Sequence, residues 1–234
     1  MEKLNIVQLF IPQANNNRPG RTNPANFITI HETGNTAKGA NARAHANFLK
    51  NPNTAVSYHY TVDDAEIVQH LPETEDAFHA GDGAGKGNRQ SIGIEICVNS
   101  DGDFAKAVDR TIQLVADICT RRNIPVENIR QHFHWSGKNC PTNIRAGKPF
   151  AWSVFLEKVA QSLKPVPAEA PGVNLQISGK TLRIPAQNEN GRWIINLPNG
   201  PEGQPQPTIL LRVVLETMGF TVTWDGNTNT IIAA

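Results

Sequence analysis

Histidines and a cysteine are the residues of this sequence whose types point most directly to chemistry. His31 ends a short apolar run, and His132 and His134 stand shortly before Cys140. Imidazole nitrogen and thiolate sulfur suit Zn2+, and a catalytic zinc site uses three protein ligands and leaves its fourth position open. We therefore expect a metal site formed by His31, His132 and Cys140. The alternatives are a core histidine at position 31 and an inert buried thiol at position 140, because the spacing matches no zinc finger and no His-Glu-x-x-His helix.

Two apolar runs predict the strands that position the first of these residues. The run 27–31 is β-branched and aromatic, which is typical of a buried strand, and it delivers His31 at its C-terminal end. Along 91–98, isoleucines alternate with smaller or polar residues. Because successive side chains of a strand point to opposite faces, Glu95 is expected opposite the apolar face.

Helical periodicity appears between the predicted strands. Over 105–122, apolar residues recur at spacings of three and four, which predicts an amphipathic helix packed on a sheet and places Cys119 in the core. Shorter helices are predicted over residues 41–49 and 152–163. A further strand at 57–62 would place Tyr58 and Tyr60 on one face. Strands separated by helices predict an α/β domain whose helices cover a central sheet.

A proline-rich stretch divides the chain. Three prolines within 165–171 prevent a helix and favour an extended, semi-rigid spacer. We therefore expect a first domain over 1–164, a linker over 165–172 and a second, small α+β domain over 173–234. In the small domain, strands are expected at 173–184, 193–197, 220–224 and 230–233, and a helix at 208–218.

Charge and composition exclude several classes of protein. Lys and Arg number 22 against 21 Asp and Glu, so the net charge of +1 gives no field to hold a nucleic acid. No run of about 18 apolar residues is present to cross a bilayer, and the first residues lack the apolar core of a signal peptide. The three cysteines cannot all pair, and a chain of this size needs no disulfide. We expect no nucleic-acid partner and no membrane insertion.

Five motifs, taken together, resemble a known family. They lie in order at residues 28–35, 57–60, 79–81, 88–95 and 132–141. Over about residues 20–145 the chain is similar to the type 2 N-acetylmuramoyl-L-alanine amidases. These are the zinc amidases of phage endolysins and bacterial autolysins, and they are related to the peptidoglycan recognition proteins. The resemblance implies a central mixed sheet flanked by helices, the zinc amidase fold, with zinc held by His31, His132 and Cys140.

The resemblance also implies roles for residues beside the metal. Zinc lowers the pKa of a bound water to about 7 and polarises a carbonyl group. Glu95 is the expected general base, and Tyr58 and Lys138 resemble the family's transition-state donors. The alternatives are a solvated strand carboxylate at position 95 and a surface loop cation at position 138. His79 is expected to line the substrate groove or to serve as a structural hydrogen-bonding residue. His134 is expected to be a residue of the cleft or one that supports the metal ligands from behind.

The reaction that this resemblance implies is hydrolysis of one amide bond in bacterial peptidoglycan. The bond joins the lactyl group of N-acetylmuramic acid to the L-alanine of the stem peptide. The alternative is a non-catalytic module that binds the same peptidoglycan. Without a signal peptide, the protein would be made in the host cytoplasm and would act on the cell wall after release. Both a phage lysin and a bacterial enzyme freed by lysis fit that route.

The C-terminal segment shows a second resemblance. Residues 210–225 resemble the small domain named after the copper amine oxidase N-terminus, which is found appended to Gram-positive cell-surface proteins. The segment contains no histidine or cysteine, so no copper site is implied. We expect this domain to target the enzyme to the wall. Trp193 and Trp224 suit sugar stacking, although in so small a domain they also suit the core.

Overall fold

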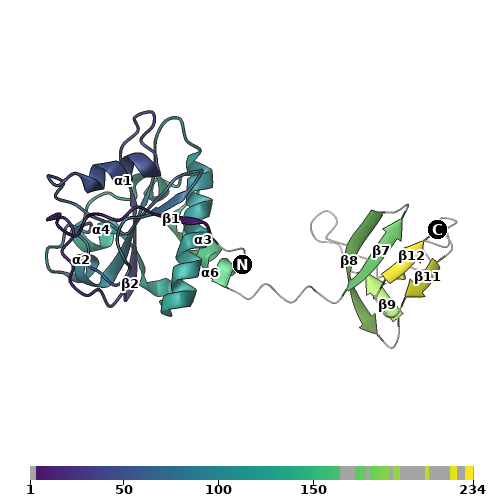
Figure 1. Ribbon diagram of the computed structural model, residues 1–234. Coiled ribbons are helices and arrows are strands. Elements are labelled where there is room, and N and C mark those ends of the chain that lie inside the picture. The colour runs from purple at the N-terminus through teal and green to yellow at the C-terminus, as the bar shows by residue number, and fades with distance from the viewer. Residues whose placement is uncertain are drawn as a thin grey trace. The chain divides into compact units, whose positions relative to one another are not determined.

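The computed structural model divides the chain into two compact units, Met1–Lys164 and Pro165–Ala234 (Figure 1). In the first unit the structure describes residues 4–163. In the second it describes the backbone of six strands, β7 to β12. These are Gly172–Ile177, Lys180–Glu189, Arg192–Ile195, Ile209–Leu210, Val222–Asp225 and Thr230–Ala233.

A six-stranded mixed sheet forms the centre of the first unit, with the strand order β1-β4-β3-β5-β2-β6. Strands β3, β5, β2 and β6 run parallel to one another, while β4 is antiparallel to β3 and parallel to the edge strand β1. The six strands in chain order are Ile6–Gln8, Phe27–Glu32, Tyr60–Val62, Ile67–Gln69, Ser91–Ile96 and Ile129–Gln131.

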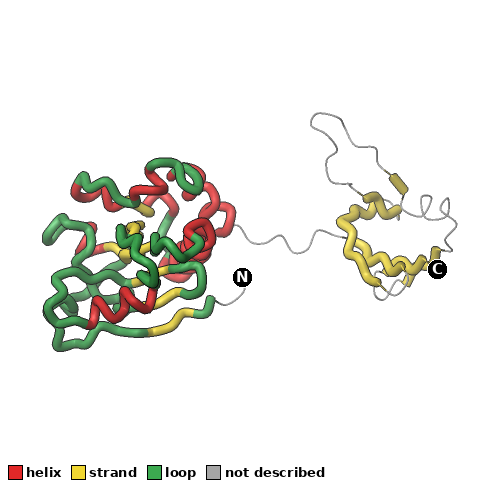
Figure 2. Tube along the Cα trace, turned by 90° about the horizontal axis from the view of Figure 1, so that it is seen from above, coloured by secondary structure: helices red, strands yellow, loops and turns green. Residues whose placement is uncertain are grey.

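Helices lie on both faces of this sheet, as Figures 1 and 2 show. Helices α3 (Phe104–Arg122) and α6 (Trp152–Leu163) pack on one face in the main apolar core. Helix α1 (Ala42–Lys50) packs on the other face, against Val68 and Cys97. Four short segments complete the unit: α2 (Lys86–Gln90), η1 (Val126–Asn128), α4 (His132–Ser136) and α5 (Thr142–Arg145). The expected α/β domain with a central mixed sheet flanked by helices is confirmed.

Helix α3 follows directly from its sequence. The side chain of Asp103 accepts the backbone N–H of Lys106, which caps the first turn, and Asn123 ends the helix in the left-handed conformation at φ 53°. The apolar positions predicted for its inner face are buried, and Cys119 is 3% exposed in the core. No helix of the described residues is long and apolar enough to cross a membrane.

Some expected elements differ in their bounds. The strand expected over 57–62 begins only at Tyr60, and just before it the side chain of His59 accepts the N–H of Gly93 on β5. The strand expected over 173–184 is two antiparallel strands, β7 and β8, which pair with each other. Of the helix expected over 208–218, residues 209–210 form strand β10, and residues 208 and 211–218 lie outside the described residues.

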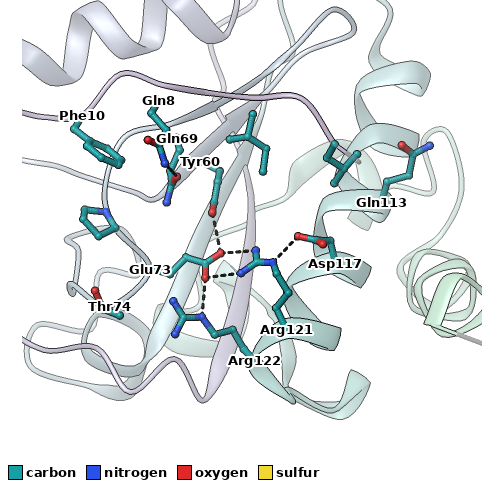
Figure 3. A pocket seen from close by; sticks show the side chains of 13 residues that line it. Gln8, Phe10, Tyr60, Gln69, Glu73, Thr74, Gln113, Asp117, Arg121 and Arg122 are labelled. Carbon is teal, nitrogen blue, oxygen red and sulfur yellow. Dashed lines mark hydrogen bonds and ion pairs between the residues drawn. The ribbon is translucent and has the colours of Figure 1, made fainter. Parts of the chain in front are cut away.

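A buried carboxylate ties the C-terminal end of α3 to the first residue of strand β3 (Figure 3). Glu73 is 5% exposed and accepts hydrogen bonds from Tyr60 (2.8 Å), Arg121 (3.0 Å) and Arg122 (2.7 Å). Burial alone would raise the pKa of Glu73, but these hydrogen bonds outweigh it and lower the pKa to about 2. The cluster borders a hollow of about 1010 Å³ that contains no histidine or cysteine. We interpret it as a structural ion cluster.

Replacing Glu73 with Gln should therefore lower the free energy of unfolding at pH 7 by about 2 kcal/mol. The folded-state pKa of about 2 lies below the ordinary 4.5, so the stabilisation is complete above about pH 4.5 and is lost as the pH falls toward 2. Urea unfolding at a series of pH values checks this. Glu66→Gln, which removes the carboxylate that pairs with the 56% exposed Arg43, is the matched control and should cost less than about 1 kcal/mol. A deficit for Glu73→Gln that stays constant from pH 7 to pH 3 would contradict the assignment.

Candidate metal centre

The register of two parallel strands brings the first predicted ligand beside the predicted base. His31 on β2 is the Cα partner of Glu95 on β5, and Thr29 is the partner of Gly93. The isoleucines that alternate with these residues are buried in the core on the α3 face. His31 and Glu95 therefore share the opposite face, where Oε1 of Glu95 lies 3.9 Å from Nδ1 of His31.

The other two predicted ligands reach the same point from the chain that follows β6. His132 is the first residue of α4, and its Nδ1 lies 2.9 Å from Nδ1 of His31. Sγ of Cys140 lies 4.0 Å from the same His31 nitrogen. One ligand atom from each of the three buried residues lies within 4.8 Å of the others. The structure thus brings the predicted set together.

The chemistry of this cluster suits a soft or borderline divalent metal. Two imidazole nitrogens and one sulfur are a donor set that zinc accepts, with one position left over. Burial, followed by the neighbouring His79, His132 and Lys138, lowers the pKa of His31, which leaves its ring neutral and able to donate a lone pair. Burial raises the pKa of the Cys140 thiol to about 12, so a thiolate there requires a nearby cation.

Glu32, which the sequence analysis did not single out, fixes the segment that carries Cys140. Its buried carboxylate accepts the backbone N–H of Asn143 (2.9 Å), the Asn143 side-chain amide (2.9 Å) and the backbone N–H of Ile144 (3.0 Å). Its own N–H points to Sγ of Cys140 at 3.4 Å. The residue next to His31 thus anchors the loop of another ligand, which local spacing in the sequence does not reveal.

Glu95 has the environment of a carboxyl group that exchanges protons near neutral pH. Its side chain is 14% exposed, and its Oε2 is buried without a hydrogen-bond partner in the described part of the chain. Burial raises the pKa of Glu95 to about 8, opposed by the charge of Lys138 and reinforced by that of Glu32. The alternative of a solvated strand carboxylate does not fit this burial.

Tyr58 and Lys138 both line the cleft of about 260 Å³ that contains Glu95 and His132. The Tyr58 side chain is buried, and its hydroxyl lies 3.2 Å from Nδ1 of His45. Lys138 is exposed and forms no ion pair within the described residues, so its ammonium group is free to meet a ligand. The expected shared face of Tyr58 and Tyr60 is wrong, because Tyr60 points into the core on the α3 side.

His79 and His134 lie in different surroundings. His79 is buried, lines the cleft and lies 2.9 Å from His31. His134 is exposed, packs edge-on against Trp135 at 4.7 Å between ring centroids, and does not line the cleft. His134 is therefore not a residue of the cleft, and no hydrogen bond among the described residues ties it to the proposed ligands. One turn of α4 carries His132 inward and His134 outward.

Residues 21–143 match the N-acetylmuramoyl-L-alanine amidase family, Amidase_2, and this match covers the cluster and the cleft. The chain belongs to the N-acetylmuramoyl-L-alanine amidase family. It is 55% identical to the amidase XlyA of Bacillus subtilis over 141 residues, which are 60% of this chain and 48% of XlyA. It is 48% identical to the amidase CwlH of Bacillus subtilis over 171 residues, 73% of this chain and 67% of CwlH.

A solved amidase structure agrees with the fold of the first unit. The structure of the catalytic domain of XlyA matches with a TM-score of 0.64 at 51% identity, and covers 67% of this chain and 99% of that domain. The chain itself spans about half the length of XlyA. The family match therefore lies in the first unit of the chain, which contains the cluster of His31, His132 and Cys140 and the cleft.

Proposed function

We propose that this protein is a zinc-dependent N-acetylmuramoyl-L-alanine amidase that acts on bacterial peptidoglycan. It hydrolyses the bond between the lactyl group of N-acetylmuramic acid and the L-alanine of the stem peptide. The observation that carries the proposal is the cluster of His31, His132 and Cys140 beside the buried carboxyl group of Glu95. Family membership and the amidase names of XlyA and CwlH support it.

Each polar residue of the cleft has a separate role in the proposed reaction. When bound by the cluster, zinc would supply an acidified water and polarise the amide carbonyl. Glu95, whose Oε1 lies 3.9 Å from Nδ1 of His31, takes a proton from the attacking water and returns one to the leaving L-alanine nitrogen. Lys138 and the hydroxyl of Tyr58 donate to the carbonyl oxygen as negative charge develops on it.

The metal requirement gives the first test of the proposed function. A chelator should abolish hydrolysis of peptidoglycan, and one equivalent of zinc per chain should restore it. Cys140→Ser should retain zinc more weakly, because a hydroxyl is a poor substitute for a thiolate. Zinc content by atomic emission and the release of stem peptides provide the measurements, with Cys119→Ser, a core cysteine, as the matched control. Full activity of the metal-free chain would refute the proposal.

The base role of Glu95 separates cutting from binding. Glu95→Gln keeps the shape of the side chain, so zinc content and wall binding should persist, while turnover should fall by about two to four orders of magnitude. Steady-state rates on a soluble muropeptide, together with a pelleting assay on walls, measure the two properties. A loss of less than about threefold would assign the base to another residue. A wild-type chain that binds walls without releasing peptides would instead favour the recognition module.

For the second unit, we propose the copper amine oxidase N-terminal-like domain that its sequence resembles, in the role of a wall-targeting module. The described residues that form the ligand cluster and the cleft all belong to the first unit. A second binding surface on a short tether raises the local concentration of the enzyme at the wall without a new catalytic contact. Action on the wall after release from the cell fits this arrangement.

Truncation after Lys164 should separate these roles. Hydrolysis of a small soluble muropeptide should stay within about twofold of the full chain, while binding to intact walls and lysis of whole cells should fall. Kinetic assays on both substrates and a wall-pelleting assay check this. If the truncated chain loses zinc or becomes insoluble, the tail has a structural role and the targeting proposal fails.

A further inference from the structure

His79 lies directly behind the first ligand of the cluster. Nδ1 of His31 faces His132 and Cys140, so its other ring nitrogen, Nε2, points away from them. This Nε2 lies 2.9 Å from Nδ1 of His79, and the two rings meet edge to face with centroids 5.0 Å apart. Both rings are buried, His31 at 1% and His79 at 8% exposure.

The hydrogen-bond partners assign the proton on each ring. A histidine that binds a metal through Nδ1 carries its proton on Nε2, so His31 donates and Nδ1 of His79 accepts. The proton of a neutral His79 then sits on Nε2, which faces Oγ of Ser91 at 3.5 Å. The hydroxyl of Ser91 donates a hydrogen bond to the carbonyl of Gly87 at 2.6 Å, so the lone pairs of Oγ can accept the N–H of His79.

Further donors close this chain of hydrogen bonds. The hydroxyl of Thr29 lies 2.7 Å from Oγ of Ser91, and the indole N–H of Trp135 donates to Thr29 at 2.9 Å. With Ser91 donating to Gly87, Thr29 donates to Ser91 and accepts from Trp135. The donor and the acceptor of each hydrogen bond between Trp135 and Ser91 are therefore fixed. Moving the His79 proton from Nε2 to Nδ1 would place two donors face to face at His31 and two acceptors face to face at Ser91.

Backbone contacts hold the His79 ring in place. The backbone N–H groups of His79 and Ala80 both donate to the side-chain oxygen of Asn88, at 2.8 and 2.7 Å. The ring lies over Gly93, where an added Cβ would come within 2.8 Å of it. The His59 ring meets it edge to face with centroids 6.1 Å apart, and Nδ1 of His59 accepts the N–H of Gly93. Only glycine at position 93 leaves room for the His79 ring.

We propose that His79 is a positioning residue for the metal centre. It accepts the Nε2 proton of His31 and thereby fixes the tautomer in which Nδ1 of His31 is the ligand atom. The inference rests on the proposed function, because it takes His31 as a metal ligand. It goes further in assigning His79 to the metal and not to the substrate, although the residue also lines the cleft.

Zinc affinity of the full chain, measured by competition with a chelator, tests this role. His79→Phe keeps a ring but removes the acceptor, and should weaken zinc binding by about 10- to 100-fold. In His79→Asn the amide oxygen stands about where Nδ1 was, so it should recover most of the affinity. His70→Phe is the matched control, because the His70 ring is also buried but is bonded to Thr61 at 2.7 Å and to none of the proposed ligands, and it should change affinity by less than threefold.

Cobalt absorption spectra and unfolding curves of the metal-free variants separate positioning from packing. Positioning predicts that His79→Phe alters the cobalt ligand-field bands and that His79→Asn restores them. His79→Phe binding zinc within threefold of the wild type would overturn the inference. So would a rise in KM with unchanged zinc affinity, which is the signature of a substrate contact.

Nitrogen-15 NMR of the zinc-loaded wild-type chain gives a test that needs no variant. The inference expects the His79 proton on Nε2 and an unprotonated Nδ1, and a proton on Nδ1 would overturn it. Failure of this inference is distinguishable from failure of the proposed function. A wild-type chain that binds no zinc refutes both. Normal zinc binding by the wild type, with a zinc affinity of His79→Phe within threefold of it, refutes the inference alone.

Discussion

The parallel register of β2 against β5 is the constraint on which the site depends. It sets His31 opposite Glu95, and the strict alternation of side chains turns the neighbouring isoleucines of both strands into the core beneath α3. A shift of one residue would send His31 and Glu95 into that core and expose the isoleucines. The hydrophobic energy of the core thus holds the proposed ligand His31 and the buried carboxyl group of Glu95 within 3.9 Å of each other.

Buried polar residues around the proposed ligands fix the orientation of the ligand side chains. Glu32 binds the loop that carries Cys140 through three amide donors, and His79 stands between His31 and the hydroxyl groups on the neighbouring strands. These groups are buried, so each bond left unmade would cost the desolvation of a polar atom. The centre is therefore held by hydrogen bonds across distant parts of the chain, in addition to the ligands themselves.

The sequence was informative wherever a pattern is local. Periodicity predicted α3 and the strands that carry His31 and Glu95, because alternation and helical spacing are properties of neighbouring residues. Periodicity failed at Tyr58, which precedes the first residue of β3, so the alternation of a strand does not apply to it. Neither the outward turn of His134 nor the anchoring by Glu32 could be predicted, since both depend on how α4 and α5 meet the sheet. The ligand set came from residue types and from resemblance to a family.

The proposed amidase activity requires that the cleft cut a single type of amide bond. Mass spectrometry of purified cell walls digested by the full chain tests it most directly. The account predicts stem peptides that begin with a free L-alanine amino group, together with glycan strands that carry intact lactyl groups and no peptide. Fragments cut within the glycan or within the peptide, or walls left intact in the presence of zinc, would contradict it.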